Sequence, residues 1–259
     1  MKIFVNGCSH TRGTAECLDN NLKAAWPYRL QKLLGASEVV NKSLEGHGND
    51  RIIRSTVEDI ILDPTPPDLA IIQLSHLDRF EVPHNSELAF TSMLPLTFLR
   101  GHDFSHSPNS IETKFCEKYF DFINKKNISS TLEDKFLIQI VTLINFFENQ
   151  DIDYILMCWD DWQSNNFHDR LWKLIDTTKV VNYHNDGVQP MNHILKSHGF
   201  KLSKKIRPDG SIDNHFQSDA HEYIAHSIFN FIKTGRKMVP SNINKIYDRD
   251  YEEAVNHYG

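Results

Sequence analysis

The sequence lacks the cysteine and histidine patterns that hold zinc. Its 14 histidines include no HExxH pair, and its four cysteines include no CxxC pair, and these are common spacings of zinc ligands. No metal site is therefore expected. The cysteines are spread along the chain as Cys8, Cys17, Cys116 and Cys158, a distribution typical of reduced thiols in a cytosolic protein.

Long apolar runs and an excess of positive charge are also missing. No window approaches 18 consecutive apolar residues, and no charged segment leads into an apolar stretch at the start, so neither a membrane span nor a usual export signal is predicted. The 28 Lys and Arg against 34 Asp and Glu give a net charge of −6, which disfavours nucleic acid as a partner. We expect a soluble cytoplasmic protein, or a virion-associated one if the source is a virus, with no membrane partner.

Short apolar runs alternate with amphipathic segments, which indicates repeated strand–helix units and a mostly parallel sheet. Asn49 is placed to cap one of the helices, and the capping box Ser130-Thr131-Leu132-Glu133 starts another. The other predicted helices cover 25–35, 51–62, 169–177 and 218–233, and the predicted strands cover 2–7, 38–43, 68–75, 153–159 and 179–183. The chain is therefore predicted to be an α/β protein.

We expect one domain over residues 1–234, followed by a polar tail over 235–259. Between about 80 and 129 the strand–helix pattern gives way to a mixture of Pro, His, Ser and aromatic residues. So long an insertion in an α/β domain is typical of a lid or a cap that faces the substrate. The tail contains three tyrosines and is a candidate for docking on the body or on a partner protein.

Polar residues follow three of the predicted strands, in Gly7-Cys8-Ser9-His10, in 43–50 and in 73–79. Because the carboxyl ends of parallel strands line one crevice, we expect these loops to converge. A fourth polar segment, 213–221, precedes the last helix. A serine hydroxyl is a good nucleophile only when an imidazole removes its proton, and a carboxylate best orients that imidazole. Ser9, His215 and Asp213 supply these groups, although Ser9 alone would also suit a helix cap.

The blocks match a known family in order and in spacing. The chain resembles the SGNH/GDSL hydrolases, in a divergent form, through Gly7-Cys8-Ser9-His10, Gly46 with Asn49, and Asp213-x-His215 with Ser218 and His221. The resemblance covers most of the chain apart from the insertion and the tail. It implies a three-layer α/β/α, flavodoxin-like fold with a five-stranded parallel sheet. It also implies a serine esterase that uses no metal and no organic cofactor.

The resemblance assigns a role to each of four residues. Ser9 corresponds to the nucleophile, and its backbone N–H would be one oxyanion donor. The N–H of Gly46 would be a second donor, and such donors can each be worth roughly 10²–10³ in rate. His215 takes the place of the general base, and Asp213 would orient it.

The chain departs from the family pattern at three places. Cys8 stands where an Asp is usual. The third block reads Gln73-Leu74-Ser75-His76 instead of Gly-x-Asn-Asp, so Ser75 or His76 would have to replace the asparagine as third oxyanion donor. Ile212 occupies the usual position of the acid, so Asp213 reaches His215 differently, or His215 works in a dyad oriented by a backbone carbonyl.

The predicted reaction is the hydrolysis of an acyl ester, such as an acetyl ester, on a carbohydrate or another small polar substrate. His76 and Arg79 are the candidates for substrate binding, while Asp78 and Arg79 would alternatively form an ion pair at the rim. The rival hypothesis is an inactive SGNH-like module that binds a protein partner, through the insertion or the tail, in a larger assembly. A phosphate-binding protein is disfavoured, because GCSHTRG lacks the GxxxxGK[ST] pattern.

Overall fold

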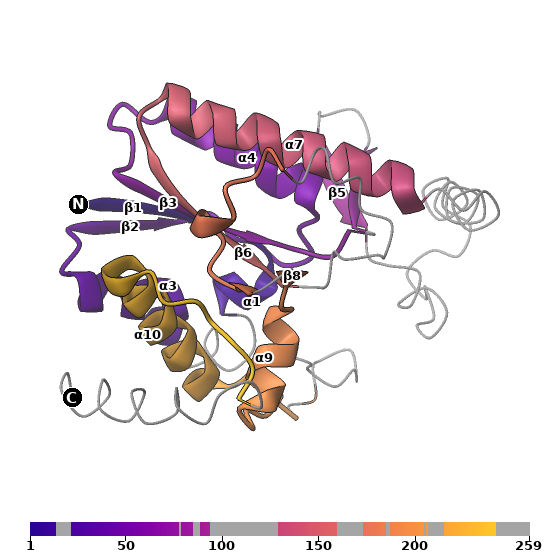
Figure 1. Ribbon diagram of the computed structural model, residues 1–259. Helices are drawn as coiled ribbons and strands as arrows, with labels where there is room; N and C mark the ends of the chain where they lie inside the picture. The colour runs from indigo at the N-terminus through magenta and orange to yellow at the C-terminus, as the bar shows by residue number, and fades with distance from the viewer. Residues whose placement is uncertain are drawn as a thin grey trace.

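The computed structural model describes residues 1–13, 22–77, 79–84, 89–93, 129–159, 173–184, 187–204, 206 and 215–241. At its centre, four parallel strands pair in the order β2 (Glu38–Asn41), β1 (Lys2–Asn6), β3 (Leu69–Leu74) and β6 (Asp153–Cys158) (Figure 1). Ile3 of β1 lies opposite Val39 on one side and Leu69 on the other. Because the strands are parallel, their carboxyl ends meet at one edge of the sheet.

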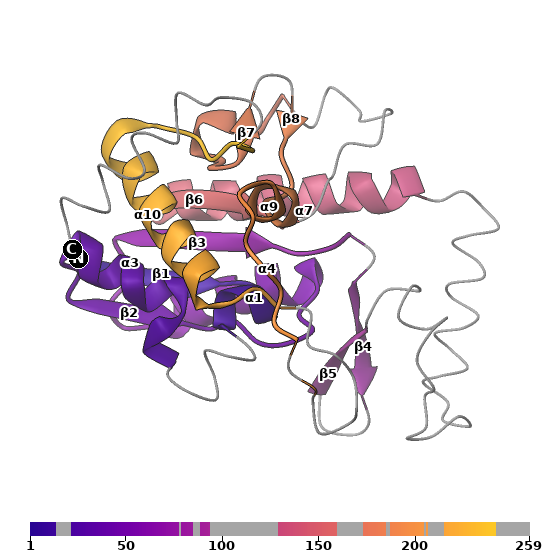
Figure 2. The same ribbon diagram turned by 90° about the horizontal axis from the view of Figure 1, so that it is seen from below.

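Helices cover both faces of this sheet and make three layers (Figures 1 and 2). One face carries α4 (Asn49–Leu62) and α7 (Ser129–Asn149). The other carries α3 (Trp26–Leu34), α9 (Met191–Ser197) and α10 (Ser218–Thr234). The structure thus confirms the predicted α/β/α architecture.

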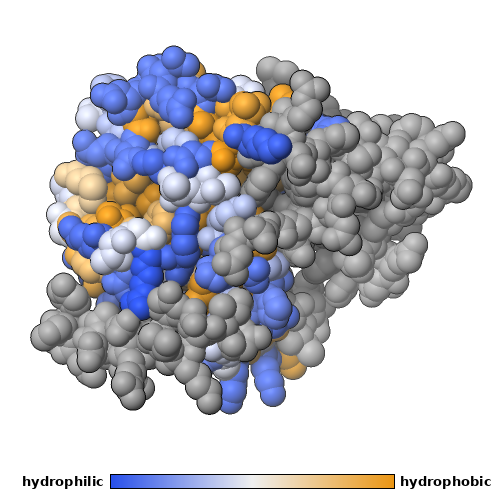
Figure 3. Space-filling model, in the orientation of Figure 1, coloured by the Kyte–Doolittle hydropathy of each residue, from blue (hydrophilic) through white to orange (hydrophobic). Residues whose placement is uncertain are grey.

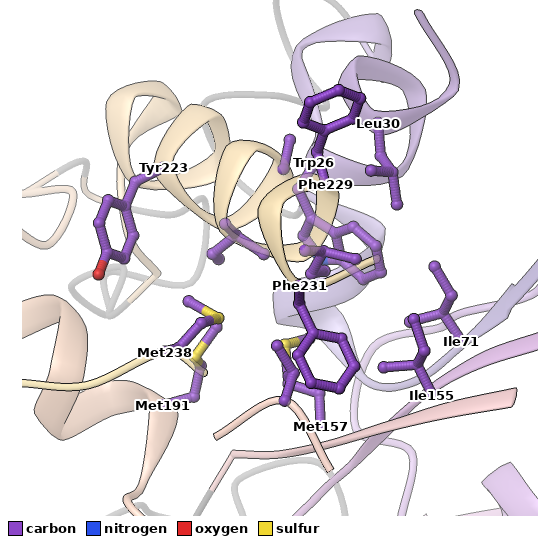
Figure 4. Packing of buried hydrophobic residues seen from close by; sticks show 14 of the residues in the cluster. Trp26, Leu30, Ile71, Ile155, Met157, Met191, Tyr223, Phe229, Phe231 and Met238 are labelled. Atoms are coloured by element: carbon purple, nitrogen blue, oxygen red, sulfur yellow. The ribbon is translucent and has the colours of Figure 1, made fainter. Parts of the chain in front are cut away.

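The core follows from the alternation of side chains along the strands. Successive strand residues point to opposite faces, so Ile3 and Val5 pack in the cluster under α3 and α10 while Phe4 packs under α4 and α7. All six residues of β3 are buried, as expected for a central strand covered on both sides. Figure 4 shows the first cluster, in which Trp26 and Leu30 of α3 lie beside Phe229 and Phe231 of α10.

Most of the predicted elements are present. The strands predicted at 2–7, 38–43, 68–75 and 153–159 are β1, β2, β3 and β6, and the helices predicted at 25–35, 51–62 and 218–233 are α3, α4 and α10. Gly35 ends α3 with a φ of 61°, a left-handed conformation that suits glycine. Helix α7 begins at Ser129, one residue before the predicted capping box.

The fifth strand is the main difference. The predicted strand 179–183 does not form as one element: Lys179 ends the 3₁₀ helix η2 (Thr177–Lys179), Val180 makes one parallel bridge with Leu156, and Tyr183 begins another short strand. Asp176 caps η2 by accepting a hydrogen bond from the N–H of Thr178 at 2.9 Å, a local bond that competes with strand pairing. The described end of the predicted helix 169–177, residues 173–176, is also not helical.

One further local prediction differs from the structure, and one helix has no counterpart among the predictions. Asn49 does not cap α4, because the N-cap position belongs to Gly48 and Asn49 is the first helical residue. The helix without a counterpart is α9, which has only seven residues. After η2, the strands β7 (Tyr183–His184) and β8 (Gly187–Val188) form a small antiparallel pair.

The described parts of the insertion form an antiparallel hairpin of β4 (Phe80–His84) and β5 (Ala89–Met93), visible beside the sheet in Figure 2. Residues 94–128 lie outside the described residues, so the cap stays a prediction. The domain boundary at 234 is likewise untested. On the far side of that boundary, Met238 and Val239 are buried.

The first residues after α10 run along the segment next to β6. The N–H of Met238 donates to the carbonyl of Val181 at 2.8 Å. Lys237 Nζ donates to the carbonyls of Thr177, Thr178 and Val180 at 2.6, 3.1 and 2.7 Å. This part of the chain is therefore bound to the body by several hydrogen bonds.

The surface seen in Figure 3 is largely hydrophilic and is interrupted by smaller apolar areas. Among the described helices, none combines the length and the apolar character needed to span a bilayer.

Candidate active site

The loop after β1 turns at Gly7, where no other residue fits. A Cβ at this position would lie 2.6 Å from Thr11 Oγ1 and 2.9 Å from Gln73 Cβ, which is closer than real Cβ contacts. Glycine allows the backbone to approach a neighbouring element this closely. The first loop therefore packs directly against the end of β3.

Ser9 begins the short helix α1 (Ser9–Arg12). Cys8 is the N-cap residue, and its carbonyl accepts hydrogen bonds from the N–H groups of Thr11 and Arg12 at 3.0 and 3.1 Å. Ser9 is therefore not the cap, and the capping interpretation of its hydroxyl is wrong. Within the described part of the chain, that hydroxyl makes no hydrogen bond.

Buried amides fix this loop from two sides. Thr11 Oγ1 donates to Gln73 Oε1 at 2.5 Å and so joins α1 to β3. Asn6 accepts from the N–H of Gly7 at 2.8 Å, and its Nδ2 donates to the carbonyl of Ile52 at 3.1 Å in α4. Because buried polar groups are costly when unpaired, these bonds restrict the loop to one arrangement.

Asn49 joins the second loop to the third. Its Oδ1 accepts from the N–H of Ser75 at 2.7 Å, and its Nδ2 donates to the carbonyls of Ser75 and His76 at 3.1 and 3.3 Å. Gly48 lies equally close to the third loop, since a Cβ there would approach the carbonyl oxygen of Arg79 to 2.7 Å. The predicted convergence of these two loops is therefore found in the structure.

Gly46 has space beside it. Its φ is 72°, a left-handed conformation that disfavours residues with a Cβ. A Cβ on Gly46 would meet no atom within 4 Å. The glycine is thus required by its backbone conformation, and the open space beside it leaves room for a ligand.

Ser75 is fully buried, and Arg79 covers it. Arg79 Nη1 donates to Ser75 Oγ at 3.1 Å. Since the oxygen accepts this bond, the hydroxyl proton of Ser75 points elsewhere. Arg79 is half-buried, whereas Ser75 is fully buried. Of these two residues, Arg79 is therefore the one nearer to the surface. Asp78, the suggested ion-pair partner, lies outside the described residues.

His215 lies far from the first loop in the sequence, three residues before α10. Its carbonyl accepts from the N–H of Ser203 at 2.7 Å, and Phe216 next to it forms an antiparallel bridge with Leu202. Phe216 is buried and packs edge-on against Trp159, with ring centroids 6.0 Å apart. The backbone and the neighbouring ring thus hold His215 in place.

His10 connects His215 to the first loop. Its ring stacks on Trp159 at 3.6 Å between centroids and lies 4.6 Å from the ring of His215. His215 is therefore brought against the residue that follows Ser9. Burial, followed by the charges of His215 and Arg79, holds the pKa of His10 well below its usual range, so His10 is neutral at pH 7.

Sequence reasoning did not identify His10 and Trp159 as part of the site. The sequence indicates them only through their positions: His10 follows Ser9, and Trp159 follows β6, whose carboxyl end lies at the same edge of the sheet. Among the predicted residues, the structure brings Ser9, Ser75, Arg79 and His215 to this edge. Asp213, the predicted acid, lies outside the described residues, so its role stays a prediction.

Two other histidines, His221 and His47, are buried and have lowered pKa values. His221 Nδ1 accepts from the N–H of Trp26 at 3.4 Å, and burial lowers its pKa to about 3. Burial also lowers the pKa of His47 to about 4. In the part of the chain that the structure describes, no group of three or more His, Cys, Asp or Glu is placed to hold a metal ion.

No family model matches the sequence, and no curated protein matches it. Several solved structures are similar to this chain. One is TesA, at 13% identity and TM-score 0.48, covering 91% of this chain and 99% of the other. Another is a catalytic mutant of Axe2, an acetylxylan esterase from Geobacillus stearothermophilus, at 15% identity and TM-score 0.46, covering 92% and 95%.

A third similar structure is a putative lipolytic protein of the G-D-S-L family from Desulfitobacterium hafniense DCB-2. It is 13% identical, with a TM-score of 0.44, and the match covers 88% of this chain and 98% of the other. The solved structures similar to this chain thus include one that is described as belonging to the G-D-S-L family.

Proposed function

We propose that the chain is a serine esterase of the SGNH type, which removes an acyl group such as acetyl from a carbohydrate or another small polar substrate. The observation that carries the proposal is the ring of His215 lying 4.6 Å from the ring of His10, the residue after Ser9. Segments from opposite ends of the chain thus bring the ring of His215 against the residue that follows Ser9, near the carboxyl ends of the parallel strands.

The proposed reaction has two halves. Ser9 Oγ attacks the ester carbonyl while His215 takes the hydroxyl proton, and His215 then returns the proton to the departing alcohol. Water, activated by the same imidazole, next attacks the acyl-enzyme and releases the acid. In each half the backbone N–H groups of Ser9 and Gly46 would bind the oxyanion, and Asp213 would orient His215.

Ser75 meets only some of the requirements for a third oxyanion donor. Its hydroxyl proton is free to donate, since Arg79 occupies an acceptor position of the oxygen. The side chain is fully buried in the structure, so a substrate would reach it only after a small movement of Arg79. His76, the alternative donor, is half-buried and stands next to it in the same loop.

The test is covalent labelling with a fluorophosphonate probe, which reacts with activated serines. We expect the wild type to be labelled and Ser9→Ala and His215→Ala to be unlabelled. Ser37→Ala and His193→Ala are matched controls, because both residues are exposed and lie on other elements, and they should label like the wild type.

A folded wild type that stays unlabelled would contradict the proposal. That result would favour the alternative function, an SGNH-like module that binds or builds a larger assembly. The insertion and the tail would then be the surfaces on which to search for a protein partner.

A further inference from the structure

Arg79 is paired less completely than Arg29 and Arg54. Arg29 is bound by Ala24, Ser218 and Glu222, and Arg54 is bound by both carboxylate oxygens of Glu58. Arg79 makes one side-chain hydrogen bond, to Ser75 Oγ, and its Nε is buried without an acceptor. Within the described residues, no carboxylate pairs with its guanidinium.

This arrangement is costly in the absence of a ligand. An arginine stays charged at all relevant pH values, and a buried donor without an acceptor lowers stability, more so when the group is charged. Ser75 restrains one end of the guanidinium, and Gly48 packs against the backbone of Arg79. The group is therefore held in position while part of its hydrogen-bonding capacity is unused.

Arg79 lies within electrostatic reach of His10, the residue after the proposed nucleophile. Its charge contributes to the lowered pKa of His10, after burial and the charge of His215. His10 follows Ser9, and the Gly48 contact places Arg79 next to the loop that carries Gly46. Arg79 thus contacts the second loop through its backbone and acts electrostatically on the residue next to Ser9.

Further positive charges act on His47 of the second loop. After burial, the charges of Arg51, Arg12 and Arg54 lower the pKa of His47 to about 4. Arg54 is paired with Glu58, so Arg12 of α1 is the cation among these three that adds to the charge of Arg79, and positive charge attracts anions.

The described carboxylates of the second loop do not neutralise Arg79. Asp50 is bound by Lys135 and Gln139 of α7, at 3.1 and 2.8 Å. Glu45 is exposed. The guanidinium therefore keeps its charge available to a ligand.

We propose that the substrate is an ester that also carries a carboxylate, such as an acylated acidic sugar, and that this carboxylate binds to the guanidinium of Arg79. The inference rests on the proposed function, which places the reaction at Ser9. A planar guanidinium matches a carboxylate with two parallel hydrogen bonds, which a lysine cannot reproduce. Arg79 would hold the substrate with its ester carbonyl toward Ser9 and so select acidic substrates over neutral ones.

The test is protection of Ser9 from the fluorophosphonate by two methyl glycosides that differ in one group. Methyl glucuronide carries a carboxylate where methyl glucoside carries a hydroxymethyl group. We expect glucuronide to slow the labelling of the wild type at least about threefold more than glucoside at equal concentration, as a charge-assisted pair would. The difference should vanish in Arg79→Gln and shrink in Arg79→Lys, whereas Lys32→Gln on α3, an exposed and distant charge, should keep it.

The possible outcomes separate this inference from the function on which it rests. Equal protection by the two glycosides, in a wild type that is labelled, would overturn the carboxylate specificity and leave the esterase proposal standing. A preference for glucuronide that persists in both Arg79 variants would also overturn it. A folded wild type without any labelling would refute the proposed function, and the inference would fall with it.

Discussion

The rings of His10 and Trp159 are stacked, with 3.6 Å between their centroids and an angle of 13° between their planes. This stack joins the first loop to the end of β6, and the ring of His215 lies 4.6 Å from that of His10, tilted by 48°. In the proposed mechanism, His10 would therefore position the general base without taking part in the proton transfer.

Replacing His10 should separate ring packing from ring chemistry. His10→Ala removes the surface against which His215 rests, so we expect fluorophosphonate labelling of Ser9 to slow about tenfold, as small displacements of catalytic groups do. His10→Phe keeps a ring on Trp159 and should label within about threefold of the wild type. Equal losses in the two variants would show instead that the imidazole nitrogens are needed.

Gly7→Ala should harm both stability and labelling. The added methyl would lie 2.6 Å from Thr11 Oγ1 and 2.9 Å from Gln73 Cβ, and forced contacts of this kind cost about 1–3 kcal/mol. The strain acts two residues before Ser9, so the rate of labelling should fall as well. Urea unfolding and labelling kinetics measure the two effects.

Gly35→Ala is the matched control for that variant. Gly35 has a φ of 61° and open space around its Cβ position, so only the backbone conformation is penalised, by about 1 kcal/mol. We expect a similar or smaller loss of stability and no change in labelling. A Gly7→Ala protein that matches this control in both measurements would contradict the tight packing at Gly7.

Asn49→Ala should destabilise the protein more than its single lost side chain suggests. The substitution leaves the N–H and the carbonyl of Ser75 without partners in the interior, while the carbonyl of His76 keeps the N–H of Arg79, and unpaired buried groups cost about 1–3 kcal/mol. We expect about 2–3 kcal/mol less stability in urea. Asn145→Ala on α7 removes one bond from an exposed residue, and it should change stability by less than about 0.5 kcal/mol.

Acid should destabilise the fold through its buried histidines. Burial lowers the pKa of His221 from 6.5 to about 3, so between these values the unfolded chain binds a proton that the folded chain does not. Stability is therefore full above about pH 6.5 and decreases as the pH falls, by about 1.4 kcal/mol per pH unit for each such histidine.

His221→Asn tests this relationship. An asparagine oxygen can accept the hydrogen bond from the N–H of Trp26 that His221 Nδ1 accepts now, but it cannot bind a proton. The slope of unfolding free energy against pH between about 6 and 4 should decrease by about one proton. An unchanged slope would mean that His221 does not stay neutral in the folded state.

Regular elements could be predicted from the sequence because their signals are local. The apolar run of β3 and the stripe of isoleucines in α10 each lie within one segment. The first loop could also be predicted, since Gly7 and Ser9 directly follow a strand. These elements and the position of Ser9 were thus accessible from local sequence, whereas the role of Ser9 as nucleophile stays a prediction.

The supports of the site could not be predicted, because their partners are distant in sequence. Asn49 was interpreted as a helix cap, whereas its side chain binds Ser75 in another loop. Gln73 was expected only as part of a polar loop, yet it accepts a hydrogen bond from Thr11. The stack of His10 on Trp159 also has no local signal, since each residue alone is an ordinary loop residue.

The segment that follows α10 has a consequence for solubility. Beyond β6, the sheet continues only as the bridge at Val180 within the described residues, and an incomplete edge of this kind can pair with the edge of another molecule. Lys237 donates to three carbonyls there, and the N–H of Met238 binds Val181. These bonds occupy backbone groups with which a strand of another molecule would otherwise pair. The segment therefore disfavours edge-to-edge aggregation.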